Sequence, residues 1–297
     1  MAIRKVLVTG CRGQLGADLI SILKQQYTVN GVDIEDLDIR DYQPVLSCLR
    51  RFKPDAVLHA AACTDVDGCE TDRSEAVAVN VVGSENVARA CREIGAGMVY
   101  YSTDYVFDGT KTSPYVESDA TGPRTVYGQT KLDGEMAVAA LLDDYAVLRI
   151  AWLYGRNGKN FVSTMLQLGR RQIEQSRRGE KLSQLKVVDD QWGSPCWTVE
   201  IARQTGVIIA NNLKGIFHVT AEGETTWYGV ARRIFDQMNM PVQLTPCSTD
   251  EFPRPAPRPH RSTLENKCLK KLGLNIMRPW EEALDEFLRQ EGEALRQ

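Results

Sequence analysis

The stretch KVLVTGCRGQLGADLI, from Lys5 to Ile20, joins a strand-like apolar run to a helix-like run through three glycines. Gly10, Gly13 and Gly16 have the spacing G-x-x-G-x-x-G. In this strand–turn–helix setting the backbone can approach a pyrophosphate and hold it at a helix N-terminus. Because a glycine triplet also serves any sharp turn, the interpretation depends on the setting. We predict a dinucleotide site here, with contacts from Gly10, Gly13, Gln14 and Leu15.

Strand-like and helix-like segments alternate through the first half of the chain. The strand-like runs are apolar with little alternation, so both of their faces should be covered. Strands are predicted at 3–9, 27–33, 55–61, 97–103 and 145–151, and helices at 14–26, 42–52, 74–94 and 126–142. This order predicts an α/β fold with a Rossmann-like, doubly wound parallel sheet.

The rhythm changes after Trp152, where strands become shorter and loops gain proline. We expect a dinucleotide-binding domain over 1–152 and a smaller α/β substrate-binding domain over 153–297, with segments that return to the first. The proline-rich run FPRPAPRPH, at 252–260, should form a wall of the cleft. Strands are predicted at 185–189, 215–220 and 242–245, and helices at 161–171, 198–211, 226–240 and 280–293.

The composition of the 297 residues excludes several classes of protein. A net charge of -3 argues against binding to nucleic acid, which needs a basic face, and no apolar run is long enough to cross a membrane. The apolar start leaves no room for a signal peptide, and the eight cysteines form no C-x-x-C pair. We therefore expect a cytoplasmic protein with reduced cysteines.

Residues that follow the second and third predicted strands are candidates for the adenosine half of the site. Asp33 lies 33 − 16 = 17 residues after Gly16, close to the spacing of an acid that binds the ribose hydroxyls. Asp33 disfavours the 2′-phosphate of NADP, whereas Arg12 could bind it, so the choice between NADH and NADPH stays open. Further cofactor contacts are predicted from Asp38, Ile39, Ala60, Ala61 and Ala62.

Tyr127 and Lys131 lie four residues apart in a predicted helix, so their side chains share one face. An ammonium about 4 Å from a phenol contributes roughly 4 kcal/mol at an effective dielectric constant near 20. That would bring the pKa of Tyr127 down toward neutrality, whereas carboxylates near Tyr105 should raise its pKa. Ser102 and Thr103 end the fourth predicted strand, where a hydroxyl can align a carbonyl. The alternative is an ordinary surface pair on a helix.

The glycine turn, the hydroxyl and the Tyr-x-x-x-Lys pair resemble, in this order, the catalytic set of the extended short-chain dehydrogenase/reductase superfamily. Six further phrases resemble the dTDP-4-dehydrorhamnose reductase family from Gly10 to about Leu269. They are STDYVFDG (102–109), VYGQTK (126–131), DVDGCE (65–70), VVDDQWGSP (187–195), GETTWYGVA (223–231) and the Arg-Pro-rich segment before STLENKCL (262–269).

The resemblance implies an enzyme that uses NADPH or NADH to reduce the C4 ketone of the nucleotide sugar dTDP-4-dehydro-L-rhamnose. Such an enzyme serves dTDP-rhamnose biosynthesis for cell-surface polysaccharide. The resemblance also implies that Tyr127 donates the proton, that Lys131 holds the nicotinamide ribose, and that Thr103 tunes the substrate carbonyl. Sugar contacts would come from Thr103, Asp104, Tyr105 and Trp152. Tyr100 and Tyr101 should instead belong to the core, and Asn80 should bond nearby backbone in its helix.

The chain departs from the family pattern in two segments. Residues 172–186 (QIEQSRRGEKLSQLK) form a longer connection than usual, and ENKCL at 265–269 replaces DNxKL. Some members of the family form homodimers through Mg²⁺, and Asp18 and Glu200 are similar in place to its ligands. No metal is assigned on that basis, because surface carboxylates usually bind only water.

Three other functions stay open at this point. A dehydratase is disfavoured because Tyr105 stands where its extra acid, a glutamate, usually follows the Thr-Asp pair. An epimerase would retain NAD through its cycle. A regulatory subunit similar to the β subunit of methionine adenosyltransferase would bind the cofactor without turnover.

Overall fold

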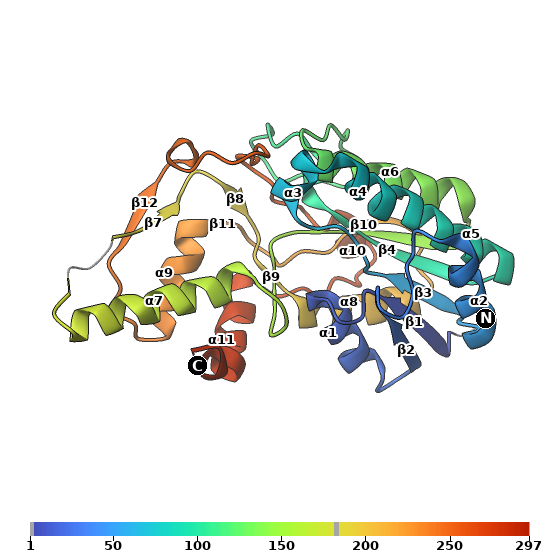
Figure 1. Cartoon of the computed structure of the whole chain (residues 1–297), viewed down its shortest axis with the longest axis horizontal. Helices are drawn as coiled ribbons and strands as arrows, with labels where there is room; N and C mark the ends of the chain where they lie inside the picture. Colours follow the sequence, from blue (N-terminus) through green and yellow to red (C-terminus); the bar gives the residue numbers. More distant parts are fainter. Residues whose placement is uncertain (1–2, 181–183, 297) are drawn as a thin grey trace.

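The computed structural model describes residues 3–180 and 184–296 and is built around a six-stranded parallel sheet (Figure 1). The strand order is β10-β5-β4-β3-β1-β2, so the direction of winding reverses between β1 and β3. Ligands of such folds bind outside the carboxyl ends of the strands at this reversal. The strands are β1 (Lys5–Thr9), β2 (Thr28–Val32), β3 (Ala56–His59), β4 (Gly97–Thr103), β5 (Tyr145–Ile150) and β10 (Gly215–His218). The predicted doubly wound α/β fold is confirmed.

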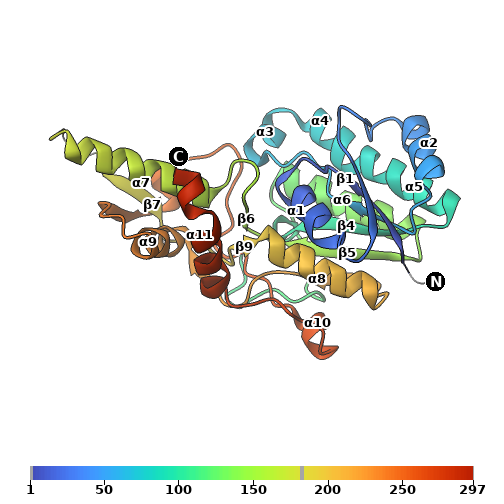
Figure 2. The same cartoon turned by 90° about the horizontal axis from the view of Figure 1, so that it is seen from below.

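Helices cover both faces of this sheet. On one face α2 (Tyr42–Phe52) packs on α5 (Ser84–Ile94), which packs on α6 (Val126–Leu141). On the other, α1 (Gln14–Leu23) packs along α8 (Thr198–Ala210), as the view from below shows (Figure 2).

Successive strand residues point into two different cores. Val6 and Val8 join the core under α1 and α8, whereas Leu7 joins the core under α2, α5 and α6. All three side chains are fully buried. Burial on both faces is the reason why the strands read as continuous apolar runs.

The helix predicted over 74–94 is broken, which corrects the sequence interpretation. After α3 (Val66–Thr71) the chain forms α4 (Arg73–Val77), a π-helical turn (Ala78–Gly83) and then α5. Such turns occur often beside functional sites. Asn80 lies in this turn and is fully buried.

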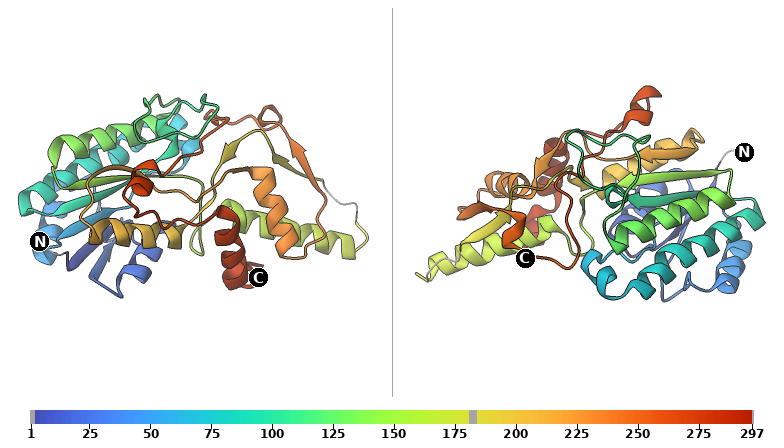
Figure 3. Two further views of the ribbon diagram at one scale, coloured as in Figure 1. Left: turned by 180° about the vertical axis from the view of Figure 1, so that it is seen from behind. Right: turned by 90° about the horizontal axis from the view of Figure 1, so that it is seen from above.

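The rest of the second half forms a smaller lobe beside the sheet (Figure 3). Its helices are α7 (Phe161–Arg177), α9 (Trp227–Gln237) and α11 (Trp280–Arg296), so α7 runs six residues beyond its predicted end. Two-stranded pairs link the segments: β7 (Leu185–Val188) with β12 (Leu244–Cys247), β8 (Trp192–Gly193) with β11 (Thr225–Thr226), and β6 (Leu153–Tyr154) with β9 (Cys196–Trp197). The predicted strand 215–220 is β10 of the large sheet, so it is one of the expected segments that return to the first half. Residues 181–183 of the long connection lie outside the described residues.

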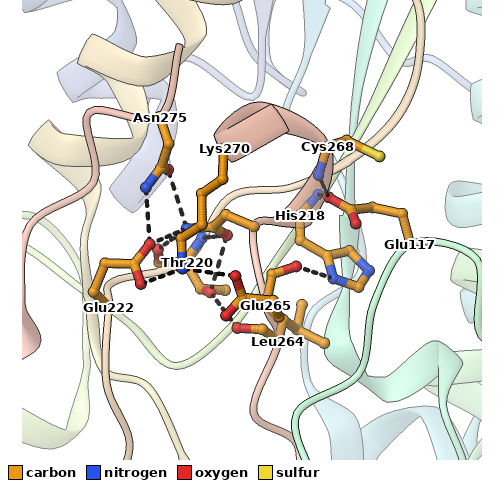
Figure 4. Close-up of polar contacts among 10 residues, drawn as sticks. Glu117, His218, Thr220, Glu222, Leu264, Glu265, Cys268, Lys270 and Asn275 are labelled. Atoms are coloured by element: carbon orange, nitrogen blue, oxygen red, sulfur yellow. Dashed lines mark hydrogen bonds and ion pairs between the residues drawn. The ribbon is translucent and has the colours of Figure 1, made fainter. Parts of the chain in front are cut away.

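The half-buried carboxylate of Glu117 ties the C-terminal segment to the edge of the sheet (Figure 4). Glu117 Oε1 accepts hydrogen bonds from the backbone N–H groups of His218, at 3.2 Å, and Cys268, at 3.0 Å. Next to it, Asn266 exchanges hydrogen bonds with the backbone of Thr220. The helix α10 (Lys267–Lys271) is thereby attached to β10. Within the described residues, no helix is both long and apolar enough to span a bilayer.

Candidate active site

A cavity of about 830 Å³ opens at the carboxyl ends of β1, β3, β4 and β5, and every residue predicted for the site lines it. At the cofactor end these are Gly10, Gly13, Gln14, Leu15, Asp33, Asp38, Ile39, Ala60, Ala61 and Ala62. At the other end they are Thr103, Asp104, Tyr105, Tyr127, Lys131 and Trp152. Segments from the whole length of the chain therefore meet in one space. The size suits a dinucleotide with a further ligand.

The glycine turn leaves room for a backbone-bound anion. Gly10 has φ +67°, and a Cβ on Gly16 would lie 2.1 Å from the Gly10 carbonyl oxygen. No side chain caps the N-terminus of α1. Its first N–H groups are consequently free for a ligand, and the helix dipole favours a negative one. This geometry fits the pyrophosphate of a dinucleotide.

Asp33 braces the turn from the end of β2. Its carboxylate accepts hydrogen bonds from the backbone N–H of Arg12 at 2.7 Å and of Ile34 at 2.9 Å. The side chain is thereby fixed at the margin of the cavity. Asp38, which also lines the cavity, is bound by the guanidinium of Arg40, and this holds the pKa of Asp38 below its usual value.

Two glycines let the helix that carries Tyr127 lie directly against β4 and the loop after it. The helix α6 begins at its N-cap Thr125, whose hydroxyl accepts a hydrogen bond from Gly128 N at 3.0 Å. A Cβ on Gly128 would lie 2.2 Å from Tyr105 O, and one on Gly134 would lie 2.3 Å from the hydroxyl of Tyr100. This close approach brings the ring of Tyr127 to 5.7 Å from that of Tyr105.

Lys131 is almost completely buried, with 2 % of its surface exposed. Its Nζ lies 4.2 Å from the ring centroid of Tyr100, and the Tyr100 hydroxyl donates to Lys131 O at 3.2 Å. Burial lowers the pKa of Lys131 to about 7, and the negative charge of Glu135 opposes this shift. The core position predicted for Tyr100 is confirmed, and its ring also supports the ammonium of Lys131.

Glu135 is held in a polar cluster that the sequence analysis missed. Arg149 donates to it from Nε at 3.0 Å and from Nη2 at 2.8 Å, and the Ser102 hydroxyl also donates to it. All three side chains are buried. Two signals were present in the sequence: Glu135 follows Lys131 by four residues, and Arg149 interrupts an apolar strand.

The pKa of Tyr127 departs from the prediction. Burial raises it above the usual value of a phenol, and a hydrogen bond with Thr103 offsets only part of the shift. The prediction that Lys131 lowers the pKa of Tyr127 is therefore wrong for this structure. Burial also lowers the pKa of Lys131 itself, so the amine is less fully protonated. The predicted rise for Tyr105 is confirmed, with burial as its main cause and Asp104 as the second.

Asp104 offers an unused acceptor at the end of β4. Its Oδ1 accepts from the Thr103 hydroxyl at 2.9 Å, whereas Oδ2 is buried and has no hydrogen-bond partner among the described residues. Burial raises the pKa of this carboxyl to about 6, and hydrogen bonding by the neighbouring hydroxyls of Ser262 and Thr103 offsets part of the shift. Because leaving such an atom unpaired is costly, it is suited to a hydroxyl group of a ligand.

Trp152 is held in a strained conformation beside the cavity. Its φ is +47°, its Nε1 donates to Ser262 Oγ at 3.1 Å, and its indole stacks on Trp227 with ring centroids 3.6 Å apart. A Cβ on Gly193 would lie 2.3 Å from the indole, so only glycine fits there. Trp227, Arg258 and Ser262 also line the cavity and were missed by the sequence analysis.

Two further expectations need correction or comment. The amide of Asn80 does not bond nearby backbone: its Oδ1 accepts from Cys63 N at 2.8 Å, and its Nδ2 donates to Cys63 O and Thr130 Oγ1. It thus holds the loop after β3 against α6.

The two carboxylates considered for Mg²⁺ have protein partners, since Asp18 accepts from the Thr198 hydroxyl and Glu200 pairs with Arg278 at 3.1 Å.

A dinucleotide-type glycine turn and a Tyr-x-x-x-Lys helix facing one cavity define a Rossmann-type protein with a reductase-like site. A family model described as "RmlD substrate binding domain" matches residues 4–292, and the chain belongs to this family. It is 39 % identical over 283 residues to a dTDP-4-keto-6-deoxy-D-glucose reductase of Streptomyces niveus, which covers 94 % of this chain and 95 % of the relative.

Two solved structures share the whole architecture. A dTDP-4-dehydrorhamnose reductase from Clostridium acetobutylicum superposes with a TM-score of 0.92 and 41 % identity, covering 97 % of this chain and 99 % of that one. A dTDP-4-dehydrorhamnose reductase from Bacillus anthracis, in complex with NADP, gives a TM-score of 0.91 and 36 % identity over 98 % and 100 % of the chains.

Proposed function

We propose that this chain is an NAD(P)H-dependent reductase that converts the C4 ketone of dTDP-4-dehydro-L-rhamnose to the hydroxyl of dTDP-L-rhamnose. The main support is the gathering of Thr103, Tyr127 and Lys131 at one end of a cavity whose other end has the glycine turn. The names of its relatives support a dTDP-linked 4-ketosugar as substrate. Residues 1–152 would bind the dinucleotide and 153–297 mainly the sugar nucleotide.

The residues of the cofactor end have distinct roles in this proposal. The free N–H groups at the start of α1 and the turn at Gly10 and Gly13 hold the pyrophosphate. Asp33 bonds the adenosine ribose, and Ala60 to Ala62 let the cofactor pass close to the backbone. When bound, the reduced nicotinamide supplies the hydride for the carbonyl carbon.

Tyr127 supplies the proton that the carbonyl oxygen needs. Its raised pKa keeps the phenol protonated at neutral pH, the state required of a donor. The Thr103 hydroxyl donates to Asp104 and is hydrogen-bonded with the phenol, so it holds the phenol in place beside the substrate oxygen. Lys131, one helical turn away, stabilises the phenolate left after transfer and holds the nicotinamide ribose.

The sugar ring lies between Asp104, Tyr105 and Trp152 in this proposal. The unpaired Oδ2 of Asp104 accepts a sugar hydroxyl. The Trp152 indole is held between Trp227 and the backbone of Gly193, and its cavity-lining part contacts the sugar. The free thiols of all eight cysteines support a cytoplasmic enzyme.

Oxidation of NADH or NADPH by the purified chain in the presence of dTDP-4-dehydro-L-rhamnose tests the proposal. Nicotinamide deuterated at the transferred position should place deuterium at C4 of the product. The ketosugar of the Streptomyces niveus relative, dTDP-4-keto-6-deoxy-D-glucose, is the competing substrate. No turnover of either ketosugar with either cofactor would defeat the proposal.

Two further measurements separate the alternative functions, and a third tests the oligomeric state. A stoichiometric synthetase partner without turnover would favour the regulatory subunit, and tightly retained NAD with interconversion of epimers would favour an epimerase. Light scattering with and without Mg²⁺ tests the homodimer.

A further inference from the structure

Four charged side chains meet where β2 ends, just outside the glycine turn. Arg12 donates from Nη1 to Glu35 at 2.6 Å and from Nη2 to Asp36 at 3.3 Å. Asp36 also accepts from the backbone N–H of Asp33, at 3.2 Å. The guanidinium of the turn is therefore engaged by two carboxylates rather than free.

Only one of these four side chains faces the space for the cofactor. Asp33 lines the cavity, whereas Arg12, Glu35 and Asp36 do not. Asp33 cannot turn away easily, because its two oxygens accept from the backbone of Arg12 and Ile34. The cavity wall at this point consequently carries a fixed negative charge.

The second guanidinium near this end is also engaged. Arg40 lines the cavity, but it binds both oxygens of Asp38 and both oxygens of Glu75. The other cations of the lining, Lys131, Lys159 and Arg258, come from α6, from the loop before α7 and from the proline-rich segment. Within the described residues, none of the cations near the end of β2 is without a carboxylate partner.

We propose that this chain selects NADH over NADPH, and that Glu35 and Asp36 enforce the selection by holding Arg12 away from the cofactor. The inference rests on the proposed function, since it assigns this end of the cavity to the adenosine ribose. A ribose 2′-hydroxyl can donate to Asp33, whereas a 2′-phosphate would meet the same carboxylate with a like charge. Glu35 and Asp36 are positioning residues, because they act through Arg12.

Calorimetric titration of the full chain with NADH and with NADPH, without substrate, tests the selection directly. We expect NADPH to bind at least about tenfold more weakly than NADH. In the variant Glu35→Gln/Asp36→Asn, Arg12 is released and can meet a phosphate with its planar fork. The Kd for NADPH should then fall at least about tenfold, while that for NADH changes less than about threefold.

Two controls make the result specific. Adding Arg12→Ala to the double variant should abolish the gain in NADPH affinity, which a merely structural role of Glu35 and Asp36 would not predict. Asp236→Asn removes an exposed carboxylate of α9, which pairs with Arg232, and should change neither Kd. Equal or tighter binding of NADPH by the unmodified chain would overturn this inference alone. Failure to bind either cofactor would instead overturn the proposed function.

Discussion

The indole of Trp152 lies flat against that of Trp227, with an interplanar angle of 5° and 3.6 Å between ring centroids. Trp152 follows β5 of the sheet, and Trp227 opens α9 of the smaller lobe. The pair therefore joins the two parts of the molecule at the cavity. It also fixes the orientation of the Trp152 indole at the cavity wall.

Replacing Trp227 should weaken sugar binding more than cofactor binding. A stacked aromatic pair contributes about 0.5–1.5 kcal/mol beyond its buried area, so Trp227→Leu should raise KM for the ketosugar roughly 3- to 10-fold. The Kd for the nicotinamide cofactor should stay the same. Trp227→Phe should recover part of the loss, and Leu272→Ala, at an exposed position after α10, should have no effect. An equal loss of cofactor binding would contradict the assigned role.

Removing the phenol oxygen of Tyr127 should abolish most of the turnover. General acid catalysis typically contributes about 10²–10⁴-fold, and Tyr127→Phe should lower kcat by that factor with cofactor binding intact. Tyr42→Phe is the matched control, since it removes an exposed phenol that donates to Glu93. A Tyr127→Phe enzyme with more than about a tenth of normal kcat would exclude Tyr127 as the donor.

Loss of the carboxylate of Glu135 should move the pH dependence of turnover. Lys131, with a pKa of about 7, is charged below that pH and loses its charge as pH rises through it. Glu135 favours the charged form, so Glu135→Gln lowers the pKa of Lys131 further, and the alkaline limb of kcat/KM should move to lower pH. His59 on β3, also near Lys131, stays neutral because burial lowers its pKa to about 3.

Two variants separate this electrostatic effect from a loss of structure. Arg149→Lys keeps a cation beside Glu135 and should leave the limb nearly in place. Glu85→Gln changes an exposed carboxylate in the first turn of α5 and should alter nothing. An unchanged limb in Glu135→Gln, with the fold intact, would show that Glu135 does not set the charge of Lys131.

Replacing Lys131 by an uncharged residue should stabilise the fold while it abolishes turnover. Burial depresses the pKa of this amine in the folded state, so the unfolded chain binds more protons between pH 7 and about 10.4, and stability rises with pH there. Lys131→Met should therefore be more stable by about 1–3 kcal/mol near neutral pH. The gain should be largest below pH 7 and vanish toward pH 10. Thermal unfolding measured across this range checks it, and a gain that grows with pH would contradict the assigned sign.

Much of the fold could be predicted because the first-half strands are buried on both faces. Leu7 and its neighbours read as a continuous apolar run for that reason. The π-helical turn at Ala78–Gly83 could not be predicted, since the helical spacing of apolar residues continues on both sides of it. The strand at 215–220 was predicted, but its pairing with β5 depends on contacts about seventy residues away in the sequence.

Local motifs predicted residues that line one cavity, whereas the pKa values of these residues could not be predicted from the motifs. Gly10, Tyr127 and Lys131 belong to short phrases whose spacing has a mechanical meaning. The pKa of Tyr127 depends on burial by several distant segments, and helical spacing alone gave the wrong sign. Trp227 contacts Trp152 from 75 residues away (227 − 152 = 75), so no local pattern connects the two.

The edge strand β10 has a practical consequence for anyone who wishes to divide the molecule. It pairs in parallel with β5, although the chain between them builds much of the smaller lobe. A truncated protein ending near Arg177 would leave the backbone of β5 without its neighbouring strand. Copies of the protein would then tend to associate through this exposed edge of the sheet. A self-sufficient nucleotide-binding fragment would have to include both α8, which covers one face of the sheet with α1, and Gly215–His218, with a linker in place of the excised lobe.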